Sequence, residues 1–193
     1  LGLFVLSDLI VDILFKRGKF GLGDVLATSD AIVMYAVGLP AFGFIKIFSV
    51  IFFSNKNTKI PFIISTFGMF INLSLILLLI DKMGHLGIAL SLSLASYINA
   101  IALYVFLWKK GFWVINKKFI KKVFKILIAA FFTYIVLIIS YMLVLFSENF
   151  NLSGLMSKAF TLITLMLISV VTFFSLLIFL KVINYKMLKK KKF

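Results

Sequence analysis

The sequence predicts an all-α integral membrane protein, and three observations support this fold class. Of the 193 residues, 63% are hydrophobic and 14% are charged, and the mean hydropathy is +1.19, whereas a soluble domain keeps roughly 25% charged residues. Uncharged runs of about 20 residues, which is the length that crosses the hydrocarbon core, recur along the chain. The charges gather in short clusters between these runs. We therefore predict a helical bundle of about six transmembrane helices.

The first element is a partial helix over residues 1–15, which is too short to cross a membrane by itself. The chain opens on Leu1, and this start has no basic region or small-residue cleavage site. We therefore expect the interior of a longer protein rather than a signal peptide. Asp8, Asp12 and Lys16 follow one another at one-turn spacing, which predicts salt bridges in preference to a proton relay.

Five full helices follow, because five stretches are long enough to span and carry almost no charge. These stretches are 31–54, which contains only Lys46, and 60–80, 83–108, 126–147 and 159–180. The basic segment 109–125 separates the last two helices from the others. We therefore predict one bundle over 1–108, a loop at 109–125, an appended helix pair over 126–180 and a basic tail at 181–193. Asn57 or Thr58 is expected to cap the helix that has Pro61 in its first turn.

The loop charges predict the orientation in the membrane. Segments 55–59, 109–125 and 181–193 together hold 15 of the 21 basic residues, and the opposite side holds five. Cytoplasmic loops carry the excess of Lys and Arg. This bias places the C-terminus in the cytoplasm, and the Lys189–Lys192 run is expected to contact anionic lipid headgroups. The cluster from Lys16 to Lys19 is the exception, because it is basic on the outer side.

The helices differ in the side chains they offer to neighbours. The 83–108 helix carries small or polar residues at every fourth position, which predicts close packing within a bundle; they are Gly87, Ser91, Ala95 and Asn99. The 126–147 helix is apolar on nearly every face and is expected to contact lipid. The 159–180 helix carries a hydroxyl stripe, interpreted as packing and local hydrogen bonding rather than as a site; it consists of Thr161, Thr164, Thr172 and Ser175.

Three polar residues at membrane depth are candidates for the functional site, because burying such groups in lipid is costly. Lys46 lies eight residues before Ser54, about 12 Å along the helix. We expect Lys46 to face an aqueous cavity or an anion; a hydrogen bond to neighbouring carbonyls and snorkelling to the interface are the alternatives. For Asn72 and Asn99 we favour a structural role, in which each amide bridges helices through hydrogen bonds, and both are also candidates for the same cavity.

Composition also excludes several classes of protein. The chain has no cysteine and one histidine, so we predict no disulfide, no catalytic thiolate, no metal site and no cofactor. Basic residues lie between apolar runs rather than on a soluble face, so nucleic acid is not an expected partner. No phosphate-binding loop, nucleophile elbow or dinucleotide fingerprint is present. We expect no catalytic residues and do not predict an enzyme; membrane lipids are the expected surroundings.

Three segments in order resemble the MurJ (MviN) family of lipid II flippases, which belongs to the MOP exporter superfamily. Residues 14–20, Leu-Phe-Lys-Arg-Gly-Lys-Phe, are similar to its LF-x-RG-x-F signature. Residues 35–61 are similar to its Y-x-x-GLP, K and FYA-x-x-DT-x-TP elements, and residues 72–91 to its N and G-x-x-GLAL pattern. The matching residues beyond Lys46 and Asn72 are Arg17, Gly18, Phe20, Gly38, Pro40, Thr58, Pro61 and Gly87. The resemblance is close over 14–93 and rests on hydropathy and loop charge over 94–193.

The resemblance implies a MOP/MATE-like fold of about fourteen helices, of which this chain supplies the end of the ninth to the fourteenth. Residues 1–108 are then part of the C-terminal lobe, and the amino-terminal lobe of the same protein becomes an expected partner. It implies alternating access at the bacterial inner membrane, with a lipid-linked peptidoglycan precursor as substrate in cell-wall biogenesis. Exporters of other lipid-linked oligosaccharides and a non-transporting fragment of a split gene are the alternatives.

The sequence departs from the family pattern at three positions. Asn57 stands where the family usually has Asp, and Ile60 where it usually has Thr. Ile76 stands one turn after Asn72, where some members carry an acidic cation ligand. We therefore do not predict a sodium site.

Overall fold

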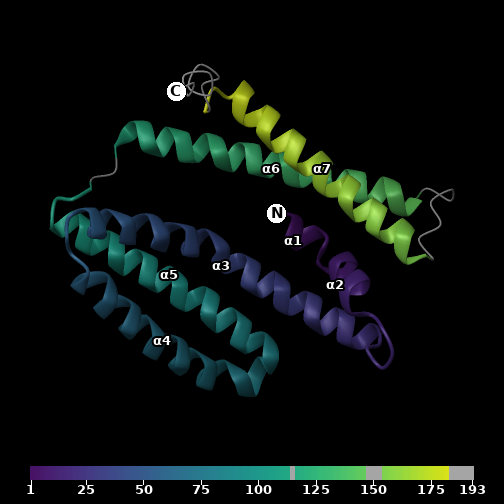
Figure 1. Cartoon of the computed structure of the whole chain (residues 1–193), viewed down its shortest axis with the longest axis horizontal. Helices are drawn as coiled ribbons and strands as arrows, with labels where there is room; N and C mark the ends of the chain where they lie inside the picture. The colour runs from purple at the N-terminus through teal and green to yellow at the C-terminus, as the bar shows by residue number, and fades with distance from the viewer. Residues whose placement is uncertain (114–115, 147–153, 183–193) are drawn as a thin grey trace. The chain divides into compact units, whose positions relative to one another are not determined.

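The chain is helical throughout the residues that the computed structural model describes, which are 1–113, 116–146 and 154–182 (Figure 1). The helices are α1 (Gly2–Val5), α2 (Ser7–Phe15), α3 (Leu22–Ser54), α4 (Lys59–Met83), α5 (His85–Lys109), α6 (Lys117–Phe146) and α7 (Leu155–Phe179). Among these residues, α3 to α7 are long and apolar enough to cross a membrane. This confirms the all-helical fold class and the five full spans. The predicted Lys189–Lys192 lipid contact lies outside the described residues.

The chain folds as two compact units whose division differs from the sequence grouping. One unit is Leu26–Val114, which contains most of α3 with α4 and α5; the other joins Leu1–Val25 to Ile115–Phe193. The sequence grouped residues 1–15 with the helices up to residue 108. The structure groups them with the last helix pair, because α1 contacts α6 and α2 contacts α7.

Within the first unit, α4 and α5 form an antiparallel hairpin (Figure 1). Gly84 makes the turn with a φ of +55°, a conformation that glycine adopts without the steric cost of a Cβ. At Gly87, an added Cβ would lie 2.7 Å from the carbonyl oxygen of Leu79. The two backbones therefore approach at a distance that only glycine allows.

Several helices start earlier than the hydropathy predicts. α3 begins at Leu22, nine residues before the predicted span, and the N–H of Gly21 donates to Asp24 Oδ2 at 2.9 Å. Likewise α6 begins at Lys117, so the second half of the predicted 109–125 loop is helical. Charged residues are excluded from the hydrocarbon, but they are compatible with helical structure. The helices therefore continue through charged turns beyond the apolar span.

The turn between α3 and α4 confirms one of the two predicted caps. Asn57 Oδ1 accepts a hydrogen bond from the N–H of Ile60 at 3.2 Å, which satisfies a donor at the start of α4. Thr58 precedes α4 but makes no side-chain capping bond. Pro61 is buried in the first turn of α4, where its missing N–H costs no helical hydrogen bond.

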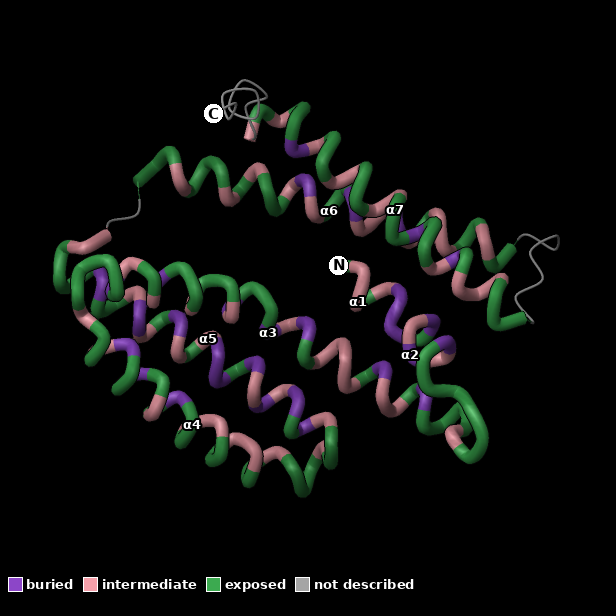
Figure 2. The backbone as a smooth tube through the Cα atoms, viewed as in Figure 1, coloured by how far each residue is buried: buried purple, intermediate pink, exposed green. Residues whose placement is uncertain are grey.

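In the second unit, α6 and α7 pack as a pair around Leu137 and Leu165, together with Leu6 from the segment between α1 and α2. Most other residues of the pair are exposed or of intermediate burial, which Figure 2 shows in green and pink. The hydroxyl stripe of α7 bonds back to carbonyls one turn earlier, over 2.6–2.9 Å. This confirms its structural interpretation. The four donors are Thr161, Thr164, Thr172 and Ser175.

An ion pair joins α2 to α7 in this unit. Asp12 accepts from Lys16 at 2.8 Å, one turn along its own helix, and from Lys158 on α7. The Asp12–Lys16 bridge was predicted, whereas Lys158 as a partner was not. Asp8 is exposed and forms no ion pair with a described residue. Asp12 therefore connects the first helices to the last one.

Candidate functional site

The candidate site is an open cavity of about 360 Å³ between α3, α4 and α5, all within the first unit. Its lining is apolar apart from two amides and two hydroxyls. α3 contributes Phe42 and Ile45; α4 contributes Ser65, Gly68, Met69 and Asn72; α5 contributes Leu92, Ala95, Ser96 and Asn99. A concave apolar site with a few convergent polar groups is the usual form of a ligand site.

Asn72 and Asn99 both line this cavity, so the structure brings together two of the three predicted site residues. Their Oδ1 atoms are buried, and neither accepts a hydrogen bond from a described residue. A buried acceptor without a partner costs roughly 1–3 kcal/mol. Within the described chain, neither Oδ1 atom accepts the interhelical hydrogen bond that the sequence favoured for these amides.

Gly68 determines how closely Asn99 approaches α4. A Cβ at position 68 would lie 3.0 Å from Asn99 Nδ2, a contact tighter than ordinary van der Waals packing. The buried Gly68 thus leaves room for the amide to lie against the backbone of the neighbouring helix. The predicted Gly87, Ser91, Ala95 and Asn99 stripe faces inward, and its first three members are buried.

Lys46 is exposed on α3 and is not among the residues that line the cavity. Its neighbour Ile45 does line it. Lys46 forms no hydrogen bond or ion pair with a described residue, so the predicted alternative of a bond to neighbouring carbonyls does not occur there.

α3 and α5 are held together by contacts that the sequence reasoning missed. Ser93 Oγ donates to the carbonyl of Met34 at 2.6 Å, and Tyr97 donates to that of Val37 at 2.9 Å. At Gly38, an added Cβ would lie 2.7 Å from Ser93 Oγ and 3.0 Å from its Cα. Ser93 and Tyr97 lie one turn apart on the helix that carries Asn99. This spacing is the sequence pattern that could have predicted the two bonds to α3.

Pro40 explains why hydroxyl donors are useful at this point of α3. It lies inside the helix and has no N–H to donate to the carbonyl one turn earlier, at Ala36. In lipid, side-chain donors and neighbouring helices satisfy the backbone around such a break. The donors from α5 reach Met34 and Val37, on either side of Ala36.

The remaining predicted residues form turns. Gly18 has a φ of +58° and follows Arg17, whose carbonyl accepts from the N–H of Phe20 at 3.1 Å. The Phe20 ring lies 6.2 Å from that of Phe15, measured between centroids. These contacts close the turn between α2 and α3, so the Arg-Gly-x-Phe segment is a structural turn.

No three side chains of the metal-ligating types His, Cys, Asp or Glu gather closely enough to hold a metal ion in the described part of the chain. The cavity offers hydrogen-bond donors and acceptors, from amides and hydroxyls, within an apolar surround.

Comparisons with known proteins agree with the sequence resemblance. The family model described as "Lipid II flippase MurJ" matches residues 1–163. A probable lipid II flippase MurJ of Rickettsia prowazekii (strain Madrid E) is 35% identical over 187 residues, covering 95% of this chain and 36% of the relative. A probable lipid II flippase MurJ of Buchnera aphidicola subsp. Schizaphis graminum (strain Sg) is 36% identical over 199 residues, covering 98% and 37%.

The fold agrees as well. A solved structure, "Lipid II flippase MurJ, inward closed conformation", is similar with a TM-score of 0.68 at 28% identity, covering 98% of this chain and 36% of that one. The chain thus spans somewhat more than a third of the length of the relatives it matches. The family match, the two relatives and the shared fold show that this multi-pass membrane protein belongs to the MurJ family of lipid II flippases.

Proposed function

We propose that this chain forms the C-terminal part of a flippase that moves a lipid-linked peptidoglycan precursor across the bacterial inner membrane by alternating access. The observation that carries the proposal is the family match over residues 1–163. The relatives are about three times as long as the region that aligns. We infer that residues 26–109 are part of one transporter lobe, that 117–179 form an appended helix pair, and that another lobe completes the pathway.

Lys46 is proposed to act on the anionic headgroup during crossing. Its ammonium group is exposed on α3 and has no anionic partner in the described chain. A cation in a low-dielectric pathway stabilises a pyrophosphate far more than it does in water. Lys46 would then face the pathway, while Asn72 and Asn99 would offer amides to the uncharged part of the headgroup.

A chimera tests this role of Lys46. The 193 residues replace the corresponding segment of the Rickettsia prowazekii relative, and the chimera is expressed in a strain depleted of its own flippase. The chimera is expected to restore growth, and Lys46→Ala to reduce it at least tenfold at equal membrane abundance. Lys46→Arg, which keeps the charge, is the matched control. Undiminished growth with Lys46→Ala would remove this residue from the site.

The role of the amides is tested by measuring both the free energy of unfolding and the transport rate of the same variant. Asn99→Leu removes a buried acceptor that has no partner, so the free energy of unfolding should stay the same or rise by about 1 kcal/mol. Transport by the same chimera should fall, because the cavity loses one of its polar groups. If Asn99→Leu instead destabilises the chain and leaves transport intact, the amide is structural.

Orientation is part of the proposal, and the absence of cysteine makes it directly measurable. Single cysteines replace Lys110 at the end of α5 and Lys19 between α2 and α3, both of which are exposed. A membrane-impermeant maleimide added outside intact spheroplasts should label the Lys19→Cys variant and spare the Lys110→Cys variant. The reverse pattern would overturn the cytoplasmic placement of the C-terminus.

A further inference from the structure

A second groove lies between α4 and α5 and is distinct from the candidate site in its chemistry. It measures about 320 Å³ and is lined almost entirely by apolar side chains. α4 contributes Ile63, Ile64, Phe67, Gly68 and Ile71, and α5 contributes Ile98, Asn99, Ala102 and Phe106. Gly68 and Asn99 are shared with the candidate site.

The groove has the length of one membrane leaflet. On α4 it runs from Ile63 to Ile71, and on α5 from Ile98 to Phe106. Eight residues of helix rise about 12 Å, and one leaflet contributes about half of the ~30 Å hydrocarbon core. Both helices are long and apolar enough to span a membrane, so lipid hydrocarbon is the expected medium at this groove. A single acyl chain in one leaflet fits this depth.

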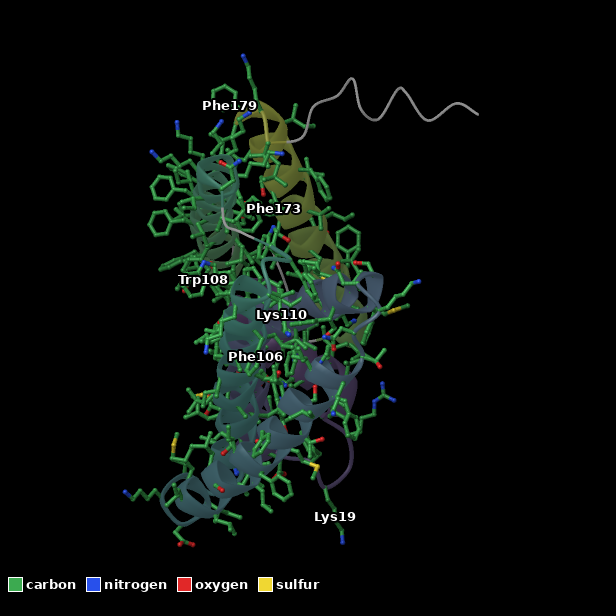
Figure 3. All side chains as sticks on the ribbon, turned by 90° about the vertical axis from the view of Figure 1, so that its left-hand side faces the viewer. Lys19, Phe106, Trp108, Lys110, Phe173 and Phe179 are labelled. Carbon is green, nitrogen blue, oxygen red and sulfur yellow. The ribbon has the colours of Figure 1, made fainter. Side chains whose placement is uncertain are left out.

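One end of the groove is basic on both helices. Lys59 opens α4 one turn before Ile63, and Lys109 closes α5 three residues after Phe106. Because the helices are antiparallel, both lysines lie at the same end, and both are exposed. Lys109 Nζ lies 6.0 Å from the centroid of the Phe106 ring, directly above the groove lining. Figure 3 shows Phe106, Trp108 and Lys110 at this end of α5.

The helices that carry the two lysines are packed together at this end by a buried apolar cluster. Phe48, Phe52, Ile64, Leu103 and Leu107 form a buried cluster there. The ring of Trp113 packs 5.5 Å from that of Phe48 between centroids. By contrast, the far end of the hairpin, at Asp81 and Lys82, carries both signs of charge. Only the end with Lys59 and Lys109 therefore has a charge complementary to an anionic group.

We propose that the α4–α5 groove is a binding site for an anionic phospholipid, with one acyl chain between Phe67 and Ala102 and the phosphate between Lys59 and Lys109. The apolar length selects a lipid chain, and the paired lysines select a negative headgroup. The site does not depend on which lipid-linked substrate the protein transports.

Fluorescence quenching by brominated lipids tests the site on the full 193-residue chain in vesicles. Phe106→Trp places a reporter in the groove, in a background in which Trp108 and Trp113 are replaced by Phe. Quenching is measured with brominated phosphatidylglycerol and, in a parallel titration, with phosphatidylcholine that carries the same brominated acyl chains. We expect phosphatidylglycerol to bind at least about fivefold more tightly than phosphatidylcholine. The reason is that each lysine near the surface raises the affinity for an anionic lipid by a factor of about five.

Two sets of variants make the result specific. Lys59→Gln with Lys109→Gln should reduce the preference to within twofold of unity, whereas Lys19→Gln with Lys82→Gln removes the same charge elsewhere and should leave it unchanged. Ala102→Phe should fill the groove and lower the depth of quenching. Circular dichroism and size-exclusion chromatography verify that each variant folds.

The proposal is overturned by any of three results. Equal quenching by both lipids in the parent chain would show that the lysines do not select a headgroup. An equal loss of preference in the Lys19 and Lys82 variants would show only a general surface charge. Stronger displacement of brominated phosphatidylglycerol by undecaprenyl phosphate than by unlabelled phosphatidylglycerol would assign the groove to a polyprenyl lipid.

Discussion

The α3–α5 unit and the α6–α7 pair pack by different means. α5 has the lowest mean hydropathy of the five spans, 1.8, against 2.5 for α6 and 2.7 for α7. In the apolar stretch of α5, 44% of the residues are buried, whereas the shares are 17% in α6 and 11% in α7; α3 has 28%, and α4 has 11%. Figure 2 shows the same contrast, with the purple segments concentrated on α5 among the long helices. Apolarity alone does not drive helices together in lipid, because the lipid tails are equally apolar.

The difference comes from small residues and from where the hydroxyls point. On α5, Ser93 and Tyr97 donate to carbonyls of another helix, and Gly38 makes room for this approach. On α7, hydroxyls such as those of Thr161 and Ser175 bond only within their own helix. The hydroxyls of α5 therefore join helices at a point where a small residue lets the backbones approach, whereas long charged side chains such as Lys158 reach a neighbouring helix without that approach.

Gly87→Ala should have the largest effect on stability. The added Cβ would lie 2.7 Å from a backbone oxygen, which cannot rotate away, so we expect a loss of up to about 3 kcal/mol. Gly43→Ala is the matched control, because nothing lies within 4 Å of its Cβ position, and it should stabilise α3 by about 0.5–1 kcal/mol. Unfolding by SDS in mixed micelles measures both. Equal effects would show that close backbone approach does not matter here.

Asp12→Asn should have the next largest effect, in the other unit. Asp12 and Lys158 are 14% and 24% exposed, and a hydrogen bond to a charged group in such a setting contributes about 2 kcal/mol. Asp8→Asn, on the same helix, removes an exposed carboxylate and should change the free energy of unfolding by less than about 0.5 kcal/mol. If the two variants unfold alike, the ion pair does not hold α2 against α7.

Ser93→Ala and Ser175→Ala should change the free energy of unfolding least. Their comparison is nevertheless the most direct one, because both variants remove a serine hydroxyl. Ser93 joins two helices, so its loss should cost about 0.6–1.7 kcal/mol. Ser175 bonds to its own helix, so its replacement by Ala should change the free energy of unfolding very little. The same SDS titration measures both variants. A larger loss at Ser175 than at Ser93 would contradict the distinction between the two regions.

The sequence predicts the fold class and the spans well, because both follow from apolar length. It also predicts the buried Gly87 stripe and the Asp12–Lys16 pair, since these follow from spacing along one helix. Helix ends are less predictable: α3 starts nine residues early because charged turns outside the hydrocarbon remain helical.

Contacts between helices are the part that sequence spacing does not determine. Hydropathy places Lys46, Asn72 and Asn99 at similar depth, but the rotation of each helix decides which of them line a shared cavity. Only the two amides do so in the described chain. The Ser93 and Tyr97 bonds depend on the same rotation, and Lys158 depends on how α7 packs against α2.

The central claim is that this chain acts as one part of a two-lobe flippase. The most direct measurement is translocation of fluorescent lipid II in proteoliposomes, comparing the 193 residues alone with the chimera that carries the amino-terminal portion of the Rickettsia prowazekii relative. We predict headgroup translocation by the chimera and none above empty vesicles by the chain alone, because alternating access requires two lobes. Translocation by the chain alone at the rate of the chimera would contradict the account.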